Sequence, residues 1–195
     1  MDGANSIMSQ FQCNTYASNL AEILTKADWQ QVDELADKLS SLIAQRGALY
    51  ICGNGGSAGN AQHLANDFLY GVSPADGDAI RVEALSANAS VLTCLGNDIG
   101  YHAIFSHQLK VKANQGDILI VLSGSGNSEN IIEAIKEAKS KGMYTVGILG
   151  YAGGKAKPLV DLPIHFDIND MQISEDLQMI VGHMLMRKLC QRDQH

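Results

Sequence analysis

Five short runs of apolar residues alternate with longer segments of helical periodicity, and this alternation limits the possible folds more than any other feature. The runs cover residues 48–52, 79–85, 117–122, 144–149 and 162–167. Short, continuous apolar runs are typical of strands that are buried on both faces. Strands separated by helices form parallel sheets with helices on both sides. We therefore predict an α/β fold with three layers, a parallel sheet between two layers of helices.

The first 46 residues predict helices rather than strands. In residues 28–47, apolar side chains recur at spacings of three and four: Trp29, Val32, Leu35, Leu39, Leu42 and Ile43. Asp28 can cap the start of this helix and Gly47 stands where its end belongs. The segment 7–24 is helical in pattern but less amphipathic, as expected for a helix that packs on another subunit. We expect one domain, 1–195, with a helical segment 1–46 and an α/β core 47–195.

Composition excludes several classes of function. The 195 residues carry a net charge of −7 and no cluster of Lys and Arg, which argues against a nucleic-acid-binding face. No apolar run approaches the about 18 residues of a membrane span, and the N-terminus lacks the pattern of a signal peptide. The four cysteines are scattered, without CxxC spacing. Free, mostly buried thiols in a cytoplasmic protein are the expectation.

Two loops rich in glycine and serine follow predicted strands. The glycine loop (53–57, GNGGS) follows the first strand, and the serine loop (123–128, SGSGNS) follows the third. In parallel sheets, ligands bind beyond the carboxyl ends of the strands. Glycines let the backbone approach a ligand, the following helix offers free N–H groups, and serine hydroxyls add donors. The serine loop therefore predicts a phosphate ester, although a simple turn with a helix cap is the alternative. Neither loop is a nucleotide-binding fingerprint.

Four titratable side chains have spacings that place them on shared helix faces. His63 and Asp67 are four residues apart, and Glu175 and His183 are eight apart. Two histidines and two carboxylates from two helices could form an acid–base pair or a metal site. The alternative is that His63 is a helix residue that makes one hydrogen bond and that His183 is a core histidine whose hydrogen bonds are satisfied. His183 lies in the apolar run MIVGHMLM, where a histidine needs a partner.

Four segments together resemble a known family. They are CGNGGSAGNAQHLANDF, LGNDIGYHAIFSHQL, GDILIVLSGSGNSENIIEAIKEAKSKGM and the final helix with its Gly-His pair. In this order they resemble the sugar isomerase (SIS) domain, and within it the bacterial phosphoheptose isomerases. The resemblance implies a five-stranded parallel sheet of the flavodoxin or Rossmann type. It also implies a homotetramer, with N-terminal helices for oligomerisation and active sites at subunit interfaces.

The resemblance also assigns expected roles to residues of this chain. It implies that the serine loop holds the phosphate of the sugar through Ser123, Ser125 and Ser128. It implies that the rest of the substrate is contacted by Asn54, Gly55, Ser57, Asp98 and Glu175. It implies proton transfer by Asp67 and His183. For the members that bind zinc, the matching positions are His63, Asp67, Glu175 and His183.

The chain departs from the family pattern at several of these positions. The family has a glutamate where this chain has Asp67, and a glutamine where it has Glu175. Asp67 is one methylene shorter, which reduces the reach of a general base. The arginine that usually follows is replaced by the stretch 71–72, and the acidic residue three before the glutamine is Gln172. These changes affect the groups that select the sugar, whereas the serine loop matches the family.

The expected function is that of a sugar-phosphate aldose–ketose isomerase. The resemblance implies conversion of sedoheptulose 7-phosphate to D-glycero-D-manno-heptose 7-phosphate for lipopolysaccharide or other surface polysaccharide, with zinc as a cofactor. Another phosphosugar is one alternative. A second is a non-catalytic SIS protein that binds a partner such as the replication initiator DnaA. A third, a sugar-phosphate-sensing regulator, would require a DNA-binding domain, and residues 1–46 show no basic recognition helix.

Overall fold

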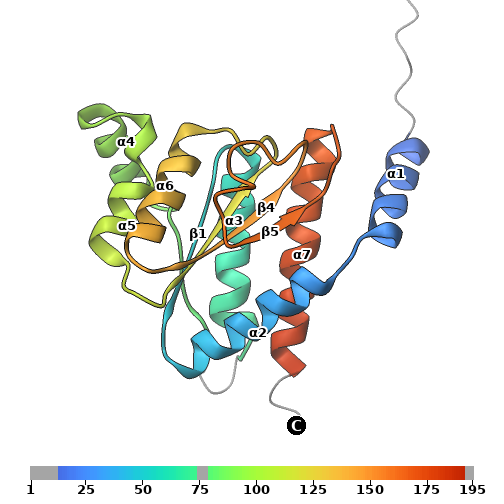
Figure 1. The fold of residues 1–195 in the computed structure, drawn as a ribbon, viewed down its shortest axis with the longest axis horizontal. Coiled ribbons are helices and arrows are strands. Elements are labelled where there is room, and N and C mark those ends of the chain that lie inside the picture. Colours follow the sequence, from blue (N-terminus) through green and yellow to red (C-terminus); the bar gives the residue numbers. More distant parts are fainter. Residues whose placement is uncertain (1–12, 74–78, 192–195) are drawn as a thin grey trace, which may run out of the picture.

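The structure, a computed structural model, describes residues 13–73 and 79–191 and contains one parallel sheet of five strands. The strand order is β2-β1-β3-β4-β5, as drawn in part in Figure 1. The strands are β1 (Ala48–Gly53), β2 (Arg81–Ala84), β3 (Ile118–Ser123), β4 (Tyr144–Leu149) and β5 (Leu162–His165). Each of the five predicted strands is therefore present, and the predicted α/β fold with a parallel sheet is confirmed.

Seven α-helices and two short turns surround the sheet within the described ranges. The helices are α1 (Cys13–Lys26), α2 (Gln30–Ala44), α3 (Gly56–Asn66), α4 (Ala89–Asp98), α5 (Ser106–Lys112), α6 (Glu129–Ser140) and α7 (Met171–Gln191). A π-helical turn, η1 (Asp67–Gly71), continues α3, and a 3₁₀ turn, η2 (Tyr101–Ala103), follows α4. Part of the predicted first helix, residues 7–12, lies outside the described residues.

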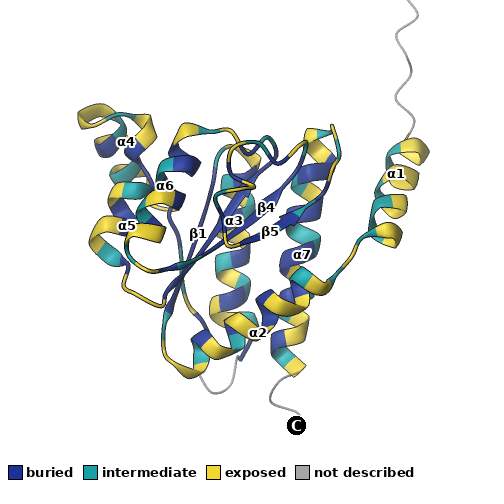
Figure 2. Ribbon diagram, in the orientation of Figure 1, coloured by how far each residue is buried: buried dark blue, intermediate teal, exposed yellow. Residues whose placement is uncertain are grey.

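The central strands β1, β3 and β4 supply both faces of the core, which is why their residues are apolar without alternation, whereas the edge strands β2 and β5 are only partly buried. In β3, Ile118, Ile120 and Leu122 pack with α2, α3 and α7, while Leu119 and Val121 pack with α5 and α6. Figure 1 shows these two groups of helices on opposite sides of the sheet, and Figure 2 shows the strands between them as buried. The result is the predicted three-layer arrangement.

The strand order places the two loops next to each other. The chain turns from β1 toward β2 on one side and continues from β3 to β4 and β5 on the other, so the topological switch point lies between β1 and β3. Gly53 pairs with Leu122, and Ser123 pairs with Leu149. The glycine loop and the serine loop therefore begin at the same edge, on either side of the point where such sheets bind ligands.

The N-terminal helices follow the predicted pattern with one local difference. The Asp28 carboxylate accepts the Gln30 N–H at 3.0 Å, as a residue at a helix start does. The left-handed turn after α2 falls on Arg46, whose φ is 56°, rather than on Gly47. A Cβ at Gly47 would overlap the Leu42 side chain, so glycine is needed there for space.

Helix α1 contributes no buried residue, and Figures 1 and 2 show it beside the main body with a largely exposed surface. Its Tyr16 hydroxyl donates to Asp176 on α7, and partial burial together with this contact raises the pKa of Tyr16 to about 12. No helix within the described ranges is long and apolar enough to cross a membrane. The cysteines are unpaired, as predicted, but only Cys52 is buried, so the expectation of mostly buried thiols was wrong.

Candidate active site

A small pocket lies between the two loops at the switch point. Its volume is about 110 Å³, room for about four water molecules at about 30 Å³ each, which suits an anion of the size of a phosphoryl group. Its lining combines both loops with the start of α7: Asn54, Ser57, Leu122, Ser123, Gly124, Ser125, Ser128, Met171 and Glu175. The pocket brings together all of the residues expected to bind substrate except Gly55 and Asp98.

The serine loop uses hydroxyl oxygens as acceptors for its own backbone. Ser123 Oγ accepts the Gly126 N–H at 3.0 Å, and Ser125 Oγ accepts the Asn127 N–H at 3.3 Å. A hydroxyl that accepts one bond keeps its own hydrogen to donate. Ser128 begins α6 without a capping bond from its side chain, and the first N–H groups of a helix have no intrahelical acceptor. These donors, at the positive end of the helix dipole, favour an anion.

A third loop, residues 150–157 after β4, packs against the serine loop. Gly126 has φ of 65°, and a Cβ there would overlap the Gly153 carbonyl oxygen. The Gly126 carbonyl accepts the Ala156 N–H at 2.9 Å, and the Asn127 side chain accepts the Lys155 N–H at 3.1 Å. Backbone lies directly on backbone here, so glycine at 126 is required for both its φ and its size.

The carboxylate of Glu175 lies over the first turn of α3. A Cβ at Gly56 would collide with both of its carboxylate oxygens, so glycine is needed for this approach. The N-terminus of α3 favours a negative charge at this place. Glu175 therefore puts a carboxylate in the wall of a pocket whose other polar groups suit an anion.

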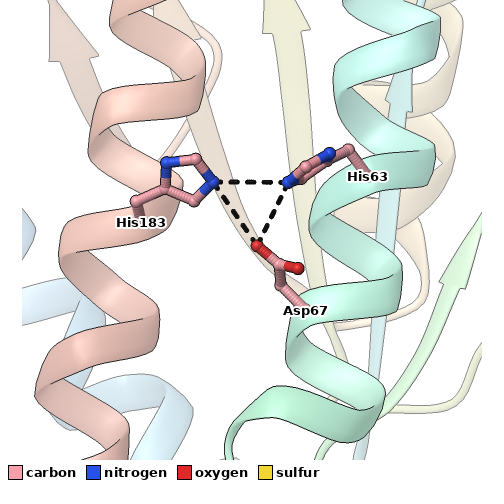
Figure 3. A group of neighbouring side chains, drawn as sticks. All are labelled: His63, Asp67 and His183. Carbon is pink, nitrogen blue, oxygen red and sulfur yellow. Dashed lines mark hydrogen bonds and ion pairs between the residues drawn. The ribbon is translucent and has the colours of Figure 1, made fainter.

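His63, Asp67 and His183 form a compact group outside this pocket. Asp67 Oδ2 lies 3.4 Å from His63 Nε2 and 3.5 Å from His183 Nε2, and the two Nε2 atoms are 3.3 Å apart. Figure 3 shows the three side chains pointing toward one another, with His183 on α7 and the other two on the facing helix. The histidine side chains are 54% and 51% exposed and Asp67 is 15% exposed. His183 thus has the partner expected of it, but it is not buried.

The close approach of α3 and α7 assembles this group. Gly182 packs on Leu64, and a Cβ at Gly182 would overlap that side chain. One turn earlier, Asn60 Nδ2 donates to the Glu175 carbonyl and to Gln178 Oε1, both at 3.0 Å. The two helices therefore run parallel and in register, from the glycine loop toward the opposite edge of the sheet.

The pocket and the group of His63, Asp67 and His183 lie at different positions along the axes of α3 and α7. Ser57 precedes His63 by six residues and Glu175 precedes His183 by eight. At about 1.5 Å per residue, the group lies about 10 Å from the pocket along the helix axes. Asp67 is also the first residue of η1, and π-helical turns inside α-helices frequently mark functional sites.

The arrangement of the group fits a metal ion. The three ligand atoms of His63, Asp67 and His183 all lie within 4.8 Å of one another. Around a tetrahedral zinc with bonds of about 2.0–2.1 Å, neighbouring ligand atoms lie about 3.4 Å apart, which agrees with the separations of 3.3–3.5 Å. Two imidazoles and a carboxylate leave a fourth position open, as catalytic zinc sites do. Glu175, the fourth expected ligand, lies in the pocket instead.

Asp98 lies at the end of α4 and is engaged locally. Its carboxylate accepts from Asn97 Nδ2 at 2.8 Å and from Cys94 Sγ at 3.5 Å. The hydrogen bond to Asp98, reinforced by its negative charge, raises the pKa of the Cys94 thiol. The structure therefore does not bring Asp98 into the pocket.

Two residues that contact the site were not predicted from the sequence. Asn130 and Tyr101 both form hydrogen bonds with Asn54, which lines the pocket. In the sequence, Asn130 is an ordinary residue in the first turn of α6. A polar amide so close to the serine loop was nevertheless a signal that could have identified it as a site residue. Tyr101 gave no signal, because only the fold brings it near Asn54.

The fold and the site together define a parallel α/β protein with a small pocket between two glycine- and serine-rich loops at its switch point and a histidine–aspartate group about 10 Å away along α3 and α7. Residues 14–150 match the SIS domain family. The phosphoheptose isomerase of Burkholderia pseudomallei (strain 1710b) is 40% identical over 154 residues, which cover 79% of this chain and 78% of that protein. The phosphoheptose isomerase of Clostridium acetobutylicum is 42% identical over 135 residues, 69% of this chain and 68% of that protein.

Two solved structures agree with this relationship over almost the whole chain. The phosphoheptose isomerase GmhA of Neisseria gonorrhoeae superimposes with a TM-score of 0.81 at 28% identity and covers 90% of this chain and 97% of that chain. A phosphoheptose isomerase from Francisella tularensis gives 0.84 at 25% identity, with coverage of 92% and 96%. The chain belongs to the SIS domain family, in the branch of the phosphoheptose isomerases.

Proposed function

We propose that this protein is an aldose–ketose isomerase that converts sedoheptulose 7-phosphate to D-glycero-D-manno-heptose 7-phosphate, for a surface polysaccharide. The observation that carries the proposal is a phosphate-sized pocket, lined by both loops and the start of α7, that lies about 10 Å along the α3–α7 helix pair from a histidine–aspartate group. The eight bonds from C1 to phosphorus in an open-chain heptose 7-phosphate extend about 9–10 Å, at about 1.1–1.2 Å per bond. This length matches the spacing of about 10 Å between the pocket and the group.

The proposed mechanism divides the work between the two parts. The serine loop and the N-terminus of α6 hold the phosphate, which fixes one end of the open-chain sugar. One of Asp67 and His183 removes the proton from the carbon next to the carbonyl, which gives an enediol. The other returns a proton at the adjacent carbon or moves protons between the two oxygens. Asp67 Oδ2 and His183 Nε2 lie 3.5 Å apart, which is close enough for the two side chains to reach neighbouring carbons of one substrate.

Zinc is the proposed cofactor, with His63, Asp67 and His183 as its ligands. When bound, zinc would supply a positive charge that stabilises the enediolate oxygen. Glu175 remains a proposed substrate contact rather than a ligand, because it lies at the pocket.

The test of the proposed function is an assay of the purified protein with sedoheptulose 7-phosphate, with and without added zinc, in which the product is followed by NMR. Turnover supports the isomerase. If other phosphosugars stabilise the protein against heat but sedoheptulose 7-phosphate is not turned over, the substrate is a different sugar. If no phosphosugar binds, the alternative of a partner-binding protein takes precedence. The retained contacts between His63, Asp67 and His183 favour the enzyme.

We expect zinc to bind at about one ion per chain when the protein is incubated with zinc and desalted. His63→Ala and Asp67→Asn each remove one of three ligands, so both variants should lose most of this zinc. Mass spectrometry of the metal content gives the measurement. His102→Ala, at an exposed histidine on η2, is the control and should retain the metal. Equal zinc in all four proteins would place the metal elsewhere.

We expect Glu175→Gln to tighten the binding of the phosphosugar. The substitution keeps the shape of the side chain but removes a negative charge from the pocket that holds the phosphate. KM should fall about two- to tenfold, while stability decreases by about 0.3–1 kcal/mol because α3 loses a favourable charge at its N-terminus. Glu137→Gln, near the far end of α6, removes the same charge and should leave KM unchanged. A higher KM in Glu175→Gln would instead mean that the proposed contact of Glu175 with the substrate depends on its negative charge.

A homo-oligomer, expected as a tetramer, is part of the proposal. Leu20, Ile23 and Leu24 of α1 are only partly buried, and a groove of about 640 Å³ lies between α1 and residues 165–168. A second copy of the chain would cover these apolar side chains. Light scattering of the purified protein measures the state directly. A cytoplasmic location stays a prediction.

A further inference from the structure

Asn54 lies at the centre of a hydrogen-bonded group that the mechanism above does not use. Its Oδ1 accepts from Asn130 Nδ2 at 2.8 Å and from the Tyr101 hydroxyl at 2.9 Å. Its Nδ2 donates in return to Asn130 Oδ1 at 2.9 Å. Three segments meet in this way: the glycine loop, the first turn of α6 behind the serine loop, and the turn η2.

These bonds leave Asn54 with only one free polar group. Both lone pairs of its Oδ1 are engaged, and one of the two hydrogens on its Nδ2 is donated to Asn130. The second N–H remains, on a side chain that lines the phosphate-sized pocket. An N–H donor is what an anion in this pocket needs, whereas a carbonyl oxygen turned toward the anion would repel it.

The partners decide which end of the Asn54 amide faces the pocket. An asparagine amide that rotates by half a turn exchanges its N–H groups for its carbonyl oxygen. Rotation of Asn54 alone would set its amino group against the Asn130 amino group, so donors would face donors, whereas the Tyr101 hydroxyl can turn to accept. Asn130 is only 2% exposed, so water cannot easily replace the lost bonds. The amide pair therefore resists rotation of either amide alone, and the Tyr101 hydroxyl adds a bond to the orientation in the structure, in which Asn54 Nδ2 keeps one free N–H.

We propose that Asn130 and Tyr101 are positioning residues, which hold the Asn54 amide so that its free N–H faces the phosphorylated substrate. This inference rests on the proposed function for the identity of the ligand. Tyr101 is 64% exposed, so its ring contributes little to the core and its hydroxyl can be removed without disturbing the fold.

The first test is kinetic. Tyr101→Phe removes one hydrogen bond, which corresponds to about a two- to tenfold rise in KM for sedoheptulose 7-phosphate, with kcat unchanged within about twofold. Asn130→Asp keeps the size of the side chain but sets a carboxylate oxygen against Asn54 Oδ1, so its KM should rise further. Tyr70→Phe, at a tyrosine that is 67% exposed, is the matched control and should leave KM unchanged.

A double-mutant cycle separates positioning from other effects. Because Tyr101 acts through Asn54, Tyr101→Phe should change KM much less in an Asn54→Ala background. Full effects in that background would overturn the inference. Unchanged KM in both single variants would overturn it as well.

A second measurement does not depend on turnover. In the ligand-free protein, hydrogen–deuterium exchange of the backbone amides at 53–58 should be faster in Tyr101→Phe and Asn130→Asp than in the wild type and in Tyr70→Phe. Unchanged exchange in both variants overturns the inference whether or not the protein is an isomerase. Faster exchange in these variants, together with a wild-type chain that turns over no phosphosugar, would leave Asn54 positioned as inferred and would refute the proposed function alone.

Discussion

Replacement of His183 by alanine is expected to reduce turnover of the phosphosugar by about 10²–10⁴-fold. The substitution removes one member of the proposed proton-transfer pair and one of the three metal ligands. The pocket lies about 10 Å away along the helix pair, so the variant should still bind sugar phosphates and be stabilised by them against heat. Because the His183 side chain is half exposed, its loss should change the free energy of unfolding by less than about 0.5 kcal/mol.

The matched control for this variant is His107→Ala, at an exposed histidine on α5. Steady-state kinetics and thermal shifts with sedoheptulose 7-phosphate should be measured on both variants. His107→Ala should behave as the wild type. Unchanged turnover in His183→Ala would refute the proposed roles of His183, whereas loss of both turnover and phosphosugar binding would place the histidine in the binding of the whole substrate.

Replacement of Gly126 by alanine is expected to abolish the stabilisation that phosphosugars give. A left-handed backbone costs an L-residue about 1–2 kcal/mol, and the overlap of the new Cβ with the Gly153 carbonyl adds about 1–3 kcal/mol. The serine loop must move to relieve this overlap, and the movement separates the serine hydroxyls from the N-terminus of α6. Thermal unfolding with and without the phosphosugar measures both effects.

Gly116→Ala isolates the conformational part of this effect. Gly116 has φ of 86°, a Cβ added there would meet no other atom within 4 Å, and the residue precedes β3 at the opposite edge of the sheet. The variant should lose only about 1–2 kcal/mol of stability and keep the response to phosphosugar. If Gly126→Ala also keeps that response, the serine loop is the simple turn and helix cap that its sequence equally allows.

The fold was predictable because its main signal is local. The central strands are apolar runs bounded by polar or glycine-rich segments, and buried parallel strands produce that pattern in any context. The edge strands β2 and β5, which include Arg81, Glu83 and His165, carry a weaker signal. Details that depend on tertiary packing, rather than on the conformational propensity of single residues, were harder to predict from the sequence. Gly47 illustrates this: its position suggested a left-handed helix end, but it is required because Leu42 occupies the space beside it.

The candidate site was predictable where one helix determines it. The spacing of His63 and Asp67 places them together on any helix, and the structure brings them to 3.4 Å. Glu175 and His183 share a face of α7, but a shared face over eight residues does not mean a shared site. The approach of α7 to α3 at Gly56 and Gly182 decides which partner each one meets, and this information is not contained in the spacing. Asn130 and Tyr101 were missed for the same reason.

The parallel alignment of α3 and α7 has a consequence for how the family can change its substrate. Because the histidine–aspartate group stands on a helix pair of fixed register, moving it to a neighbouring turn changes its distance from the pocket along the helix axes by about 5.4 Å. One carbon of a sugar chain corresponds to only about 1.2 Å. Relocation of residues along the helices is therefore far too coarse to select between sugars that differ by one carbon.

A change in side-chain length has the right size for that selection. Asp67 stands where the family resemblance implies a glutamate, and the missing methylene shortens the reach of the carboxylate by about 1.2 Å, the length of one carbon along the chain. With the phosphate anchored, a difference of one methylene in the base is therefore a finer adjustment than a move along the helices, and it requires no change in the fold.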